Sequence, residues 1–493
     1  MKIKFLPLAL LTTAMSLTWA CNPEKVPETE TQKQRLAKMY IHSAMQTYYY
    51  WNTQLPKSVN YKGSASVEDF FEGLLVGRDR WSWMESGDEY AASESGVVMG
   101  TFGASISQPL EYYKDYDVKV RYVIPGSPFD KAGVTRGWTI TYINGISKDD
   151  LVRSGQFAEL FYSPSVTTPE TFTFTDTAGK AHEIAITAAP YVNMRPALVA
   201  DIYDADDYPG LPGKVGYFNY LGFQAGIDAY GKPMMDDIKE NMDMFREAGV
   251  KYLILDLRYN GGGDSRASDT LINYLAPVSS LNRVYVTRTH NSELRKYDNS
   301  YKITRILDEQ GRDLSLNLER LYVLTGPGTA SASEMLLNGL MPLMDVRQVG
   351  DTTYGKPNGM YVLMYPDDDD NMDAYSRDDY SNLEYAFLPI CFYNSNGRGE
   401  NIPDDGLKPG AGYRPDDLYH DFGPDEDNIA ACLYHIVNGS YPELPSKTRS
   451  DATKASSGRE NARLEEEVRN QNYGIFKDIQ SEIIPNFWRI DYQ

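Results

Sequence analysis

The chain has 493 residues, with 48 lysines and arginines against 69 aspartates and glutamates, and its formal net charge at pH 7 is −21. At roughly 150 residues per domain, this length excludes a single small module. Hydrophobic residues make up 42% of the chain, which is enough for a large core, and the acidic balance argues against nucleic acid as a partner.

The first twenty residues carry a targeting signal. Two lysines precede an apolar run over residues 5–17 that is too short to cross a bilayer, so residues 1–20 are predicted to be a cleaved export signal. Cys21 follows a small residue at the cleavage point, which resembles a bacterial lipoprotein signal and implies a lipid anchor in the cell envelope, facing the periplasm or the cell surface. A plain secretory signal is the alternative. Residues 21–34 are polar and suit a tether.

The remaining cysteines and acidic residues give no metal signature. Cys391 and Cys432 lack the spacing of a metal site, and we expect two small buried residues rather than a disulfide. The acidic run at residues 367–373 lacks the glycine and the terminal glutamate of an EF-hand loop, so a solvated loop is favoured over a calcium site. We predict no metal and no organic cofactor.

Helical spacing of apolar residues, rich in aromatics, appears at residues 36–51 and 67–83. The spacing predicts a small helical N-terminal domain over residues 35–93. Aromatic clusters at this spacing are more often core than a binding platform.

Short β-type runs follow, at residues 97–99, 118–124, 138–143, 171–175 and 183–186. Between them, Gly-Ser-Pro, Ala-Gly-Val, Gly and Ile-Asn-Gly occur in that order from residue 126 to residue 145, and Ser127 with Pro128 suits a short helix entered through a turn.

This pattern resembles a PDZ domain over residues 94–190, although Trp138 stands where that family usually has Asp. The resemblance implies that an extended polypeptide adds to a sheet edge beside a carboxylate-receiving loop. The loop would consist of Gly100, Thr101, Phe102 and Gly103.

From residue 191 to residue 446 the pattern is that of an α/β domain. Residues 215–220, 252–257 and 321–324 are apolar runs typical of strands, and Met235, Ile238, Met242 and Phe245 recur on one face of a helix. Strands that alternate with helices predict an α/β layer architecture. Residues 447–493 form a polar, charged tail.

Three segments of this domain could carry chemistry. In residues 256–263, a buried strand runs into three glycines whose N–H groups could bind an anion or an oxyanion. No Gly-Lys-Ser/Thr follows, so a P-loop is disfavoured. In residues 324–334, a strand and a Gly/Pro turn lead into a helix that begins at about Ser333. Ser331 would lie at the helix start, either as a cap or as a nucleophile.

The third segment, residues 353–356, ends in Lys356. A lysine is ordinarily a surface cation, but the neighbouring Tyr354 and Pro357 make partial burial plausible. Burial disfavours an ammonium, so a buried lysine can accept a proton from a serine near neutral pH.

Together the three segments resemble the C-terminal processing proteases, a family of serine/lysine endopeptidases. Their Asp-Leu-Arg-x-Asn-x-Gly-Gly, Ser-Ala-Ser-Glu and Gly-Lys motifs match here at the family's own spacing. The resemblance implies a spiral α/β core of the ClpP/crotonase type, with an inserted or preceding PDZ domain and a polypeptide substrate. It makes Ser331 the nucleophile, Lys356 the general base, and the N–H groups of Ala332 and Gly263 the oxyanion hole.

Two positions depart from the family pattern. Met360 stands where many members have a Gln that orients the lysine, and Pro342 where Asp is common, so the group that holds Lys356 is open, with Asn358 and the Tyr354 hydroxyl as candidates.

None of the five histidines lies in a triad signature, although His290 could still approach Ser331 in the fold. The alternative function is a non-catalytic surface lipoprotein that binds peptides or glycans through the PDZ groove and its tyrosines. The oligomeric state is not predicted.

Overall fold

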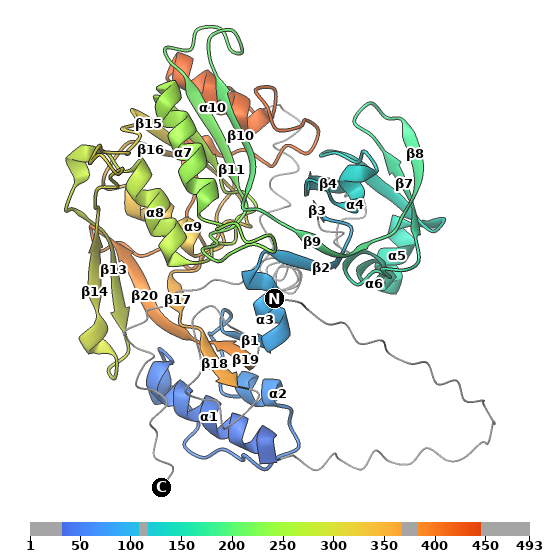
Figure 1. The fold of residues 1–493 in the computed structure, drawn as a ribbon, viewed down its shortest axis with the longest axis vertical. Coiled ribbons are helices and arrows are strands. Elements are labelled where there is room, and N and C mark those ends of the chain that lie inside the picture. The colour runs from blue at the N-terminus through green and yellow to red at the C-terminus, as the bar shows by residue number, and fades with distance from the viewer. Residues whose placement is uncertain (1–31, 108–116, 367–382, 445–493) are drawn as a thin grey trace.

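The computed structural model describes residues 32–107, 117–366 and 383–444. The predicted signal, Cys21, the acidic run at 367–373 and the C-terminal tail all lie outside these residues. The described chain forms an N-terminal helical unit, a small unit of antiparallel strands and a larger unit built on a parallel sheet (Figure 1). Within the described ranges, no helix is both long enough and apolar enough to span a membrane.

The core of the larger unit is a five-stranded sheet in the order β10-β11-β12-β15-β16. Its strands are β10 (Ala197–Tyr203), β11 (Val215–Tyr220), β12 (Tyr252–Asp256), β15 (Arg320–Thr325) and β16 (Val346–Gly350). The last four run parallel, and β10 at the edge is antiparallel. The three predicted apolar runs are therefore neighbouring strands, and their carboxyl ends meet at one edge of the sheet, where α/β proteins place their sites.

Helices cover both faces of the parallel sheet because its strands are apolar on both sides. They are α7 (Asp236–Ala248), α8 (Ser265–Leu275), α9 (Ala332–Leu340) and α10 (Asp427–Asn438). The first three share one core with Leu253 and Leu255, whereas α10 packs against Ile254 on the opposite face. The apolar spacing that predicted a helix at residues 235–245 is confirmed by α7.

A second sheet, in the order β14-β13-β20-β17, leads into a three-stranded sheet in the order β1-β19-β18. The strands are β1 (Trp83–Ser86), β13 (Val284–His290), β14 (Asn299–Lys302), β17 (Asn358–Met360), β18 (Leu363–Pro366), β19 (Leu383–Leu388) and β20 (Ile390–Asn396). Because β19 and β20 are almost continuous, the chain passes directly from one sheet into the other. Short 3₁₀ helices connect elements at Asn52–Gln54, Val278–Ser280, Arg295–Tyr297 and Gly410–Gly412.

The N-terminal helical unit packs on β18 and β19, far along the sequence (Figure 1). It contains α1 (Gln32–Tyr48), α2 (Val67–Glu72) and α3 (Gly87–Glu94). Tyr40, Ile41 and Phe71 share one buried core with Phe387 and Leu388. The start of the described chain is therefore stabilised by strands that lie far along the sequence.

One expectation for this unit is wrong. Residues 67–83 do not form one helix, since α2 ends at Glu72 and Trp83 begins strand β1. Trp83 pairs with Leu388 and Met84 with Phe387 on β19. The local apolar spacing could not reveal a strand partner that lies so far along the chain.

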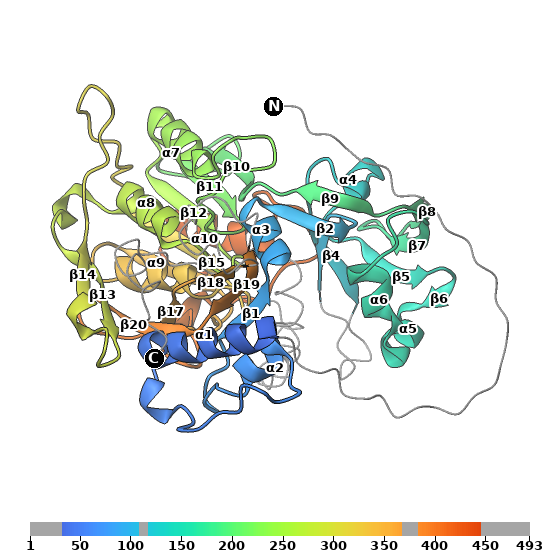
Figure 2. The same cartoon turned by 60° about the horizontal axis from the view of Figure 1, so that its bottom comes forward.

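The small unit has a sheet in the order β3-β4-β5-β7-β8, with β6 paired to β5. Its elements are β3 (Ala104–Ile106), β4 (Val118–Val123), α4 (Pro128–Lys131), β5 (Thr139–Ile143), β6 (Ile146–Ser147), α5 (Lys148–Ser154), α6 (Gln156–Tyr162), β7 (Glu170–Thr175) and β8 (Ala181–Ile186). A cluster of phenylalanines, including Phe102 and Phe129, fills its core. The ribbon of β2 (Val97–Thr101) and β9 (Ala189–Asn193) lies between this unit and the rest (Figure 2).

Candidate active site

Ser331 lies on a sharp turn between β15 and α9, at the carboxyl edge of the parallel sheet. Its backbone has φ 53° and ψ −112°, a conformation that an L-residue adopts only under strain. Among the described residues, the other non-glycine positions with positive φ are all asparagines. The sequence predicted the helix start but gave no sign of this strain, which is typical of a nucleophile on a strand-to-helix turn.

The glycine loop after β12 lies directly beside the Ser331 turn. Asn260 ties the two together, because its carbonyl accepts from the Ala330 N–H at 3.3 Å and from the Ser333 hydroxyl at 3.0 Å. The Asn260 side chain accepts from the Gly262 N–H at 2.8 Å. The structure thus brings together the first two segments that the sequence singled out.

Gly263 occupies a position that no other residue could fill. Its φ is 131°, and a Cβ at this position would lie 2.0 Å from the carbonyl oxygen of Phe223. Within the residues that the structure describes, neither the Gly263 N–H nor the Ala332 N–H has a hydrogen-bond acceptor. One of these backbone donors follows Ser331 directly in the chain, and the other lies in the glycine loop.

Glu334 connects the Ser331 turn to the lysine segment. Its carboxylate is fully buried, and its Oε2 accepts from the Ser331 N–H at 3.0 Å and from the Lys356 N–H at 2.8 Å. Its Oε1 accepts from the Thr353 hydroxyl at 2.5 Å and from the Gly355 N–H at 2.8 Å. One carboxylate oxygen therefore joins the backbones of Ser331 and Lys356, and all three segments meet.

The electrostatic state of Glu334 follows from this geometry. Burial raises its pKa, and the hydrogen bonds from Thr353, Lys356, Gly355 and Ser331 oppose that rise without cancelling it. In the sequence, Glu334 stood out only as the last residue of the Ser-Ala-Ser-Glu motif. A usable signal was present, since it is the single charged residue in the nine-residue helix α9, whose residues are all buried.

Lys356 is buried, with 3% of its surface exposed, as its neighbours in the sequence suggested. Its Nζ lies 3.6 Å from the sulfur of Met360 and 5.0 Å from the centre of the Trp83 ring. The sequence proposed Asn358 or the Tyr354 hydroxyl as the group that holds this amine. The contacts of Nζ include instead Met360, which differs from the Gln of the family pattern, and Trp83, which the sequence predicted to lie in a helical segment.

A network of charges, all buried except the partly exposed Asp416, lies behind the glycine loop. The guanidinium of Arg258 donates two hydrogen bonds to the carboxylate of Asp256, at 3.0 and 2.7 Å. It also donates to Glu426 at 2.5 Å and to Asp416 at 2.9 Å. Arg136 of the small unit also donates to Asp416, at 3.1 Å. Burial alone would raise the pKa of Asp256, but Arg258 lowers it below its ordinary value.

The histidines are engaged elsewhere. His290, which the sequence left open as a base for Ser331, has Nδ1 3.0 Å from Asp298 and Nε2 2.6 Å from the Tyr361 hydroxyl. The other four are bonded in the pairs His42–Tyr61, His182–Asp176, His420–Asp417 and His435–Tyr322. A serine–histidine arrangement therefore has no support in this fold.

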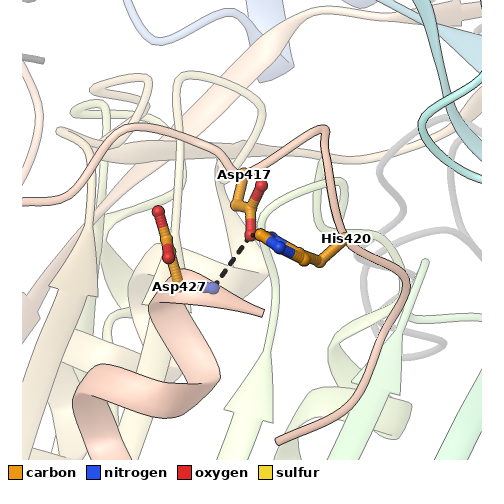
Figure 3. A group of neighbouring side chains, drawn as sticks. All are labelled: Asp417, His420 and Asp427. Atoms are coloured by element: carbon orange, nitrogen blue, oxygen red, sulfur yellow. Dashed lines mark hydrogen bonds and ion pairs between the residues drawn. The ribbon is translucent and has the colours of Figure 1, made fainter. Parts of the chain in front are cut away.

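One group in the described part of the chain has the composition of a metal site. Asp417, His420 and Asp427 each offer a ligand atom within 4.8 Å of the others (Figure 3). Asp417 Oδ2 already accepts from His420 Nδ1 at 2.7 Å and from the Asp427 N–H at 2.9 Å. The hydrogen bond from Asp417 raises the pKa of His420, so an Asp–His ion pair accounts for the arrangement.

The remaining sequence-predicted residues lie as follows. Gly100 and Thr101 end strand β2, the Phe102 ring is buried in the phenylalanine core, and the Gly103 carbonyl accepts from the Ile124 N–H at 2.8 Å. This loop leads into β3, an edge strand of the small sheet. Cys391 and Cys432 are buried free thiols, as expected.

Comparison with known proteins agrees with this geometry. The profile of peptidase family S41 matches residues 214–382, and the profile of the peptidase S41 N-terminal domain matches residues 37–83. The chain is 25% identical over 309 residues to the chloroplastic carboxyl-terminal-processing peptidase 2 of Arabidopsis thaliana, which covers 59% of this chain and 50% of that protein.

A second relative, the carboxy-terminal processing protease CtpA of Bacillus subtilis, is 25% identical over 141 residues, which covers 29% of this chain and 27% of that protein. The matches thus span half or less of the length of these curated relatives. The crystal structure of a candidate S41 protease from Bacteroides fragilis superposes with a TM-score of 0.60 at 22% identity, over 80% of this chain and 96% of that one, and so shows the same fold. The chain is therefore similar to peptidase family S41 over residues 214–382, and to the N-terminal domain of that family over residues 37–83.

Proposed function

We propose that the chain is a serine endopeptidase that cleaves extended polypeptides, with Ser331 as the nucleophile and Lys356 as the general base. The observation that carries the proposal is the shared oxygen of Glu334, which accepts from the Ser331 N–H at 3.0 Å and the Lys356 N–H at 2.8 Å. A strained serine and a buried lysine are thus anchored to one atom at the carboxyl edge of a parallel sheet.

The proposed chemistry uses groups of the chain alone. Neutral Lys356 accepts the proton of Ser331 as the hydroxyl oxygen attacks the peptide carbonyl. The N–H groups of Ala332 and Gly263 hold the oxyanion of the tetrahedral intermediate, and each such donor typically contributes about 3 kcal/mol. Lys356 then gives the proton to the leaving amine, and an acyl group stays on Ser331. A water that Lys356 deprotonates releases this acyl group.

The substrate is a polypeptide captured in extended form by the small unit acting as a PDZ domain. An extended chain would add to the edge strand β3, with its C-terminal carboxylate at the loop of Gly100, Thr101, Phe102 and Gly103. The names of the two curated relatives, which both describe carboxyl-terminal processing, fit such a capture. The N-terminal signal favours an exported protein, anchored through lipidated Cys21 in the cell envelope.

The proposal is tested with four purified variants and a fluorescent, unstructured polypeptide substrate. Ser331→Ala and Lys356→Ala should each abolish cleavage, because one removes the nucleophile and the other the base. Ser154→Ala and Lys180→Ala change a serine and a lysine of the small unit and should cleave like the wild type. Thermal unfolding of each variant checks that the fold is kept.

A serine-directed fluorophosphonate probe separates the enzyme from the binding protein that the sequence left as the alternative. The wild type should be labelled on one peptide, which mass spectrometry assigns to Ser331, and Ser331→Ala should stay unlabelled. Cleavage that persists in Ser331→Ala, or a wild type that binds polypeptide but neither cleaves it nor reacts with the probe, would overturn the proposal.

A further inference from the structure

We propose that the N-terminal helical unit is part of the catalytic apparatus, and that Trp83 is a positioning residue for the amine of Lys356. This inference rests on the proposed function, and it adds a contribution that the serine and lysine motifs do not contain.

The fold places Trp83 beside the strands that also carry Met360. Strand β1 carries Trp83 to the edge of β19, where Trp83 pairs with Leu388, and Met360 of β17 pairs with Ile390 of the adjoining strand β20. Trp83 and Met360 are thereby brought to the same amine from two elements, at 5.0 Å and 3.6 Å from Nζ. Neither contact depends on the other.

These two contacts restrict the position of the lysine amine. A lysine side chain has four rotatable bonds, so a base on such a side chain needs contacts at its tip to stay in one position. An indole face attracts a cation and offers a flat surface, whereas a thioether is a weak acceptor that fills space. Trp83 therefore contributes both position and charge stabilisation, and Met360 contributes mainly position.

A neighbouring residue of the same unit, Arg80, contacts the backbone next to Lys356. Arg80 donates to the Gly355 carbonyl at 3.1 Å and to the Asp404 carbonyl at 2.8 Å, and its guanidinium lies 5.0 Å from the ring centres of both Tyr354 and Trp81. Gly355 is thus held through its carbonyl by the N-terminal unit and through its N–H by Glu334. The unit reaches both the backbone before Lys356 and the tip of its side chain.

The unit also provides a matched control. Trp51 belongs to the same buried core as the residues around Trp83, and it too has a cation over its ring, since the guanidinium of Arg78 lies 4.8 Å from its centre. Among the described contacts, Trp51 has none with Lys356. Equal substitutions at residues 51 and 83 therefore separate a loss of packing from a loss of positioning.

The experiment compares Trp83→Leu, Trp83→Phe, Trp51→Leu and Trp51→Phe in the full chain, with Ser331→Ala as reference. Trp83→Leu should lower kcat at least tenfold and leave KM within twofold, because the substrate still binds while the base is misplaced. Trp83→Phe keeps an aromatic face and should recover most of kcat. Both Trp51 variants should keep the wild-type kcat. If the leucine variants do not fold, the two phenylalanine variants carry the comparison.

The pH profile of kcat gives a readout that packing alone would not move. The indole face favours the protonated amine, so its loss in Trp83→Leu should displace the acid limb of the profile toward lower pH, and Trp51→Leu should leave it in place. The charged side chains that the structure assigns to this segment, Glu334 of α9 and Arg80 of the N-terminal unit, are unchanged in both variants.

The outcomes distinguish the positioning role of Trp83 from the proposed endopeptidase function. If Ser331→Ala is inactive and Trp83→Leu keeps the wild-type kcat and acid limb, the inference is wrong and the proposed function stands. If Trp83→Leu and Trp51→Leu are impaired alike, Trp83 acts through packing and the inference is also wrong. Cleavage that Ser331→Ala does not abolish overturns the proposed function and the inference with it.

Discussion

Two buried carboxylates flank the candidate active site, and the protein compensates their charges in different ways. Asp256, behind the glycine loop, faces the guanidinium of Arg258 with contacts of 3.0 and 2.7 Å. Glu334, beneath Ser331 and Lys356, accepts from three backbone N–H groups and the Thr353 hydroxyl. The difference appears in their pKa values, since that of Asp256 is lowered and that of Glu334 is raised.

This contrast indicates that the two carboxylates have different roles. A pair of opposite charges in a dry interior holds elements together, and in this molecule Arg258 joins the end of β12 to Glu426 at the start of α10. A carboxylate whose hydrogen bonds all come from neutral donors holds those donors in place. The free-energy cost of burying its charge remains in part, because none of those donors carries an opposite charge. We therefore expect changes at Arg258 to act on stability and changes at Glu334 to act on turnover.

The largest expected effect is that of Arg258→Met. This variant leaves Asp256 and Glu426, both fully buried side chains, without their guanidinium partner. Breaking a buried pair from one side costs about 3–5 kcal/mol, so the free energy of unfolding in urea should fall by that amount. Arg246→Met, which breaks the surface pair with Asp243, should cost under about 1 kcal/mol. Equal losses in the two variants would contradict the argument.

The next effect is that of Glu334→Gln. The amide keeps the shape of the side chain but has one acceptor oxygen in place of two, so the variant loses either the shared acceptor of the Ser331 and Lys356 N–H groups or the acceptor of Thr353 and Gly355. Because small displacements of catalytic groups cost about a hundredfold in rate, kcat should fall by roughly that factor. Steady-state kinetics on the polypeptide substrate measure it. A variant with the wild-type kcat would show that Glu334 does not position the two residues.

A third test separates the two carboxylates by pH. The pKa of Glu334 is raised above its ordinary 4.5, so the folded state binds this proton first, and the wild type should gain stability relative to Glu334→Gln as pH falls through that raised pKa. The pKa of Asp256 is lowered below its ordinary 3.8, so its stabilisation persists down to pH 3.8 and is lost below it. Urea unfolding of the wild type, Glu334→Gln and Asp256→Asn across this range should give difference curves of opposite slope. Parallel curves would refute the contrast.

The smallest effect concerns the strain beside Glu334. Ser331 has φ 53°, which glycine adopts freely and alanine does not. Both Ser331→Gly and Ser331→Ala should be inactive, but the glycine variant should be the more stable by about 1 kcal/mol. Thermal unfolding of the two inactive proteins measures this difference. Equal stability would mean that the turn stores no strain.

Much of the larger unit could be predicted from the sequence because its signals are local. Apolar runs gave strands β11, β12 and β15, and apolar spacing gave α7. Parallel strands place their carboxyl ends at one edge, which is why the glycine loop and the Ser331 turn, each predicted to follow such a strand, lie together in the fold. Tyr354 and Pro357, which flank Lys356 in the sequence, also favoured its burial.

The contacts that complete the site could not be predicted, because each joins distant positions. Trp83 meets Lys356 only after β1 pairs with β19, and Arg258 meets Glu426 from the other end of the domain. Periodicity within a window of fifteen residues carries no information on such pairs. The strain at Ser331 was hidden for another reason, since a serine at a helix start usually signals an ordinary cap.

The pairing of β1 with β19 also sets an order of events in biosynthesis. Roughly three hundred residues are synthesised after β1 before its partner exists, which takes tens of seconds at ordinary translation rates. Throughout that interval the apolar face of α1, with Tyr40, Ile41 and Met45, lacks the residues of β18 and β19 that complete its core. The contact between Trp83 and the Lys356 amine therefore forms only after the last strands have been synthesised.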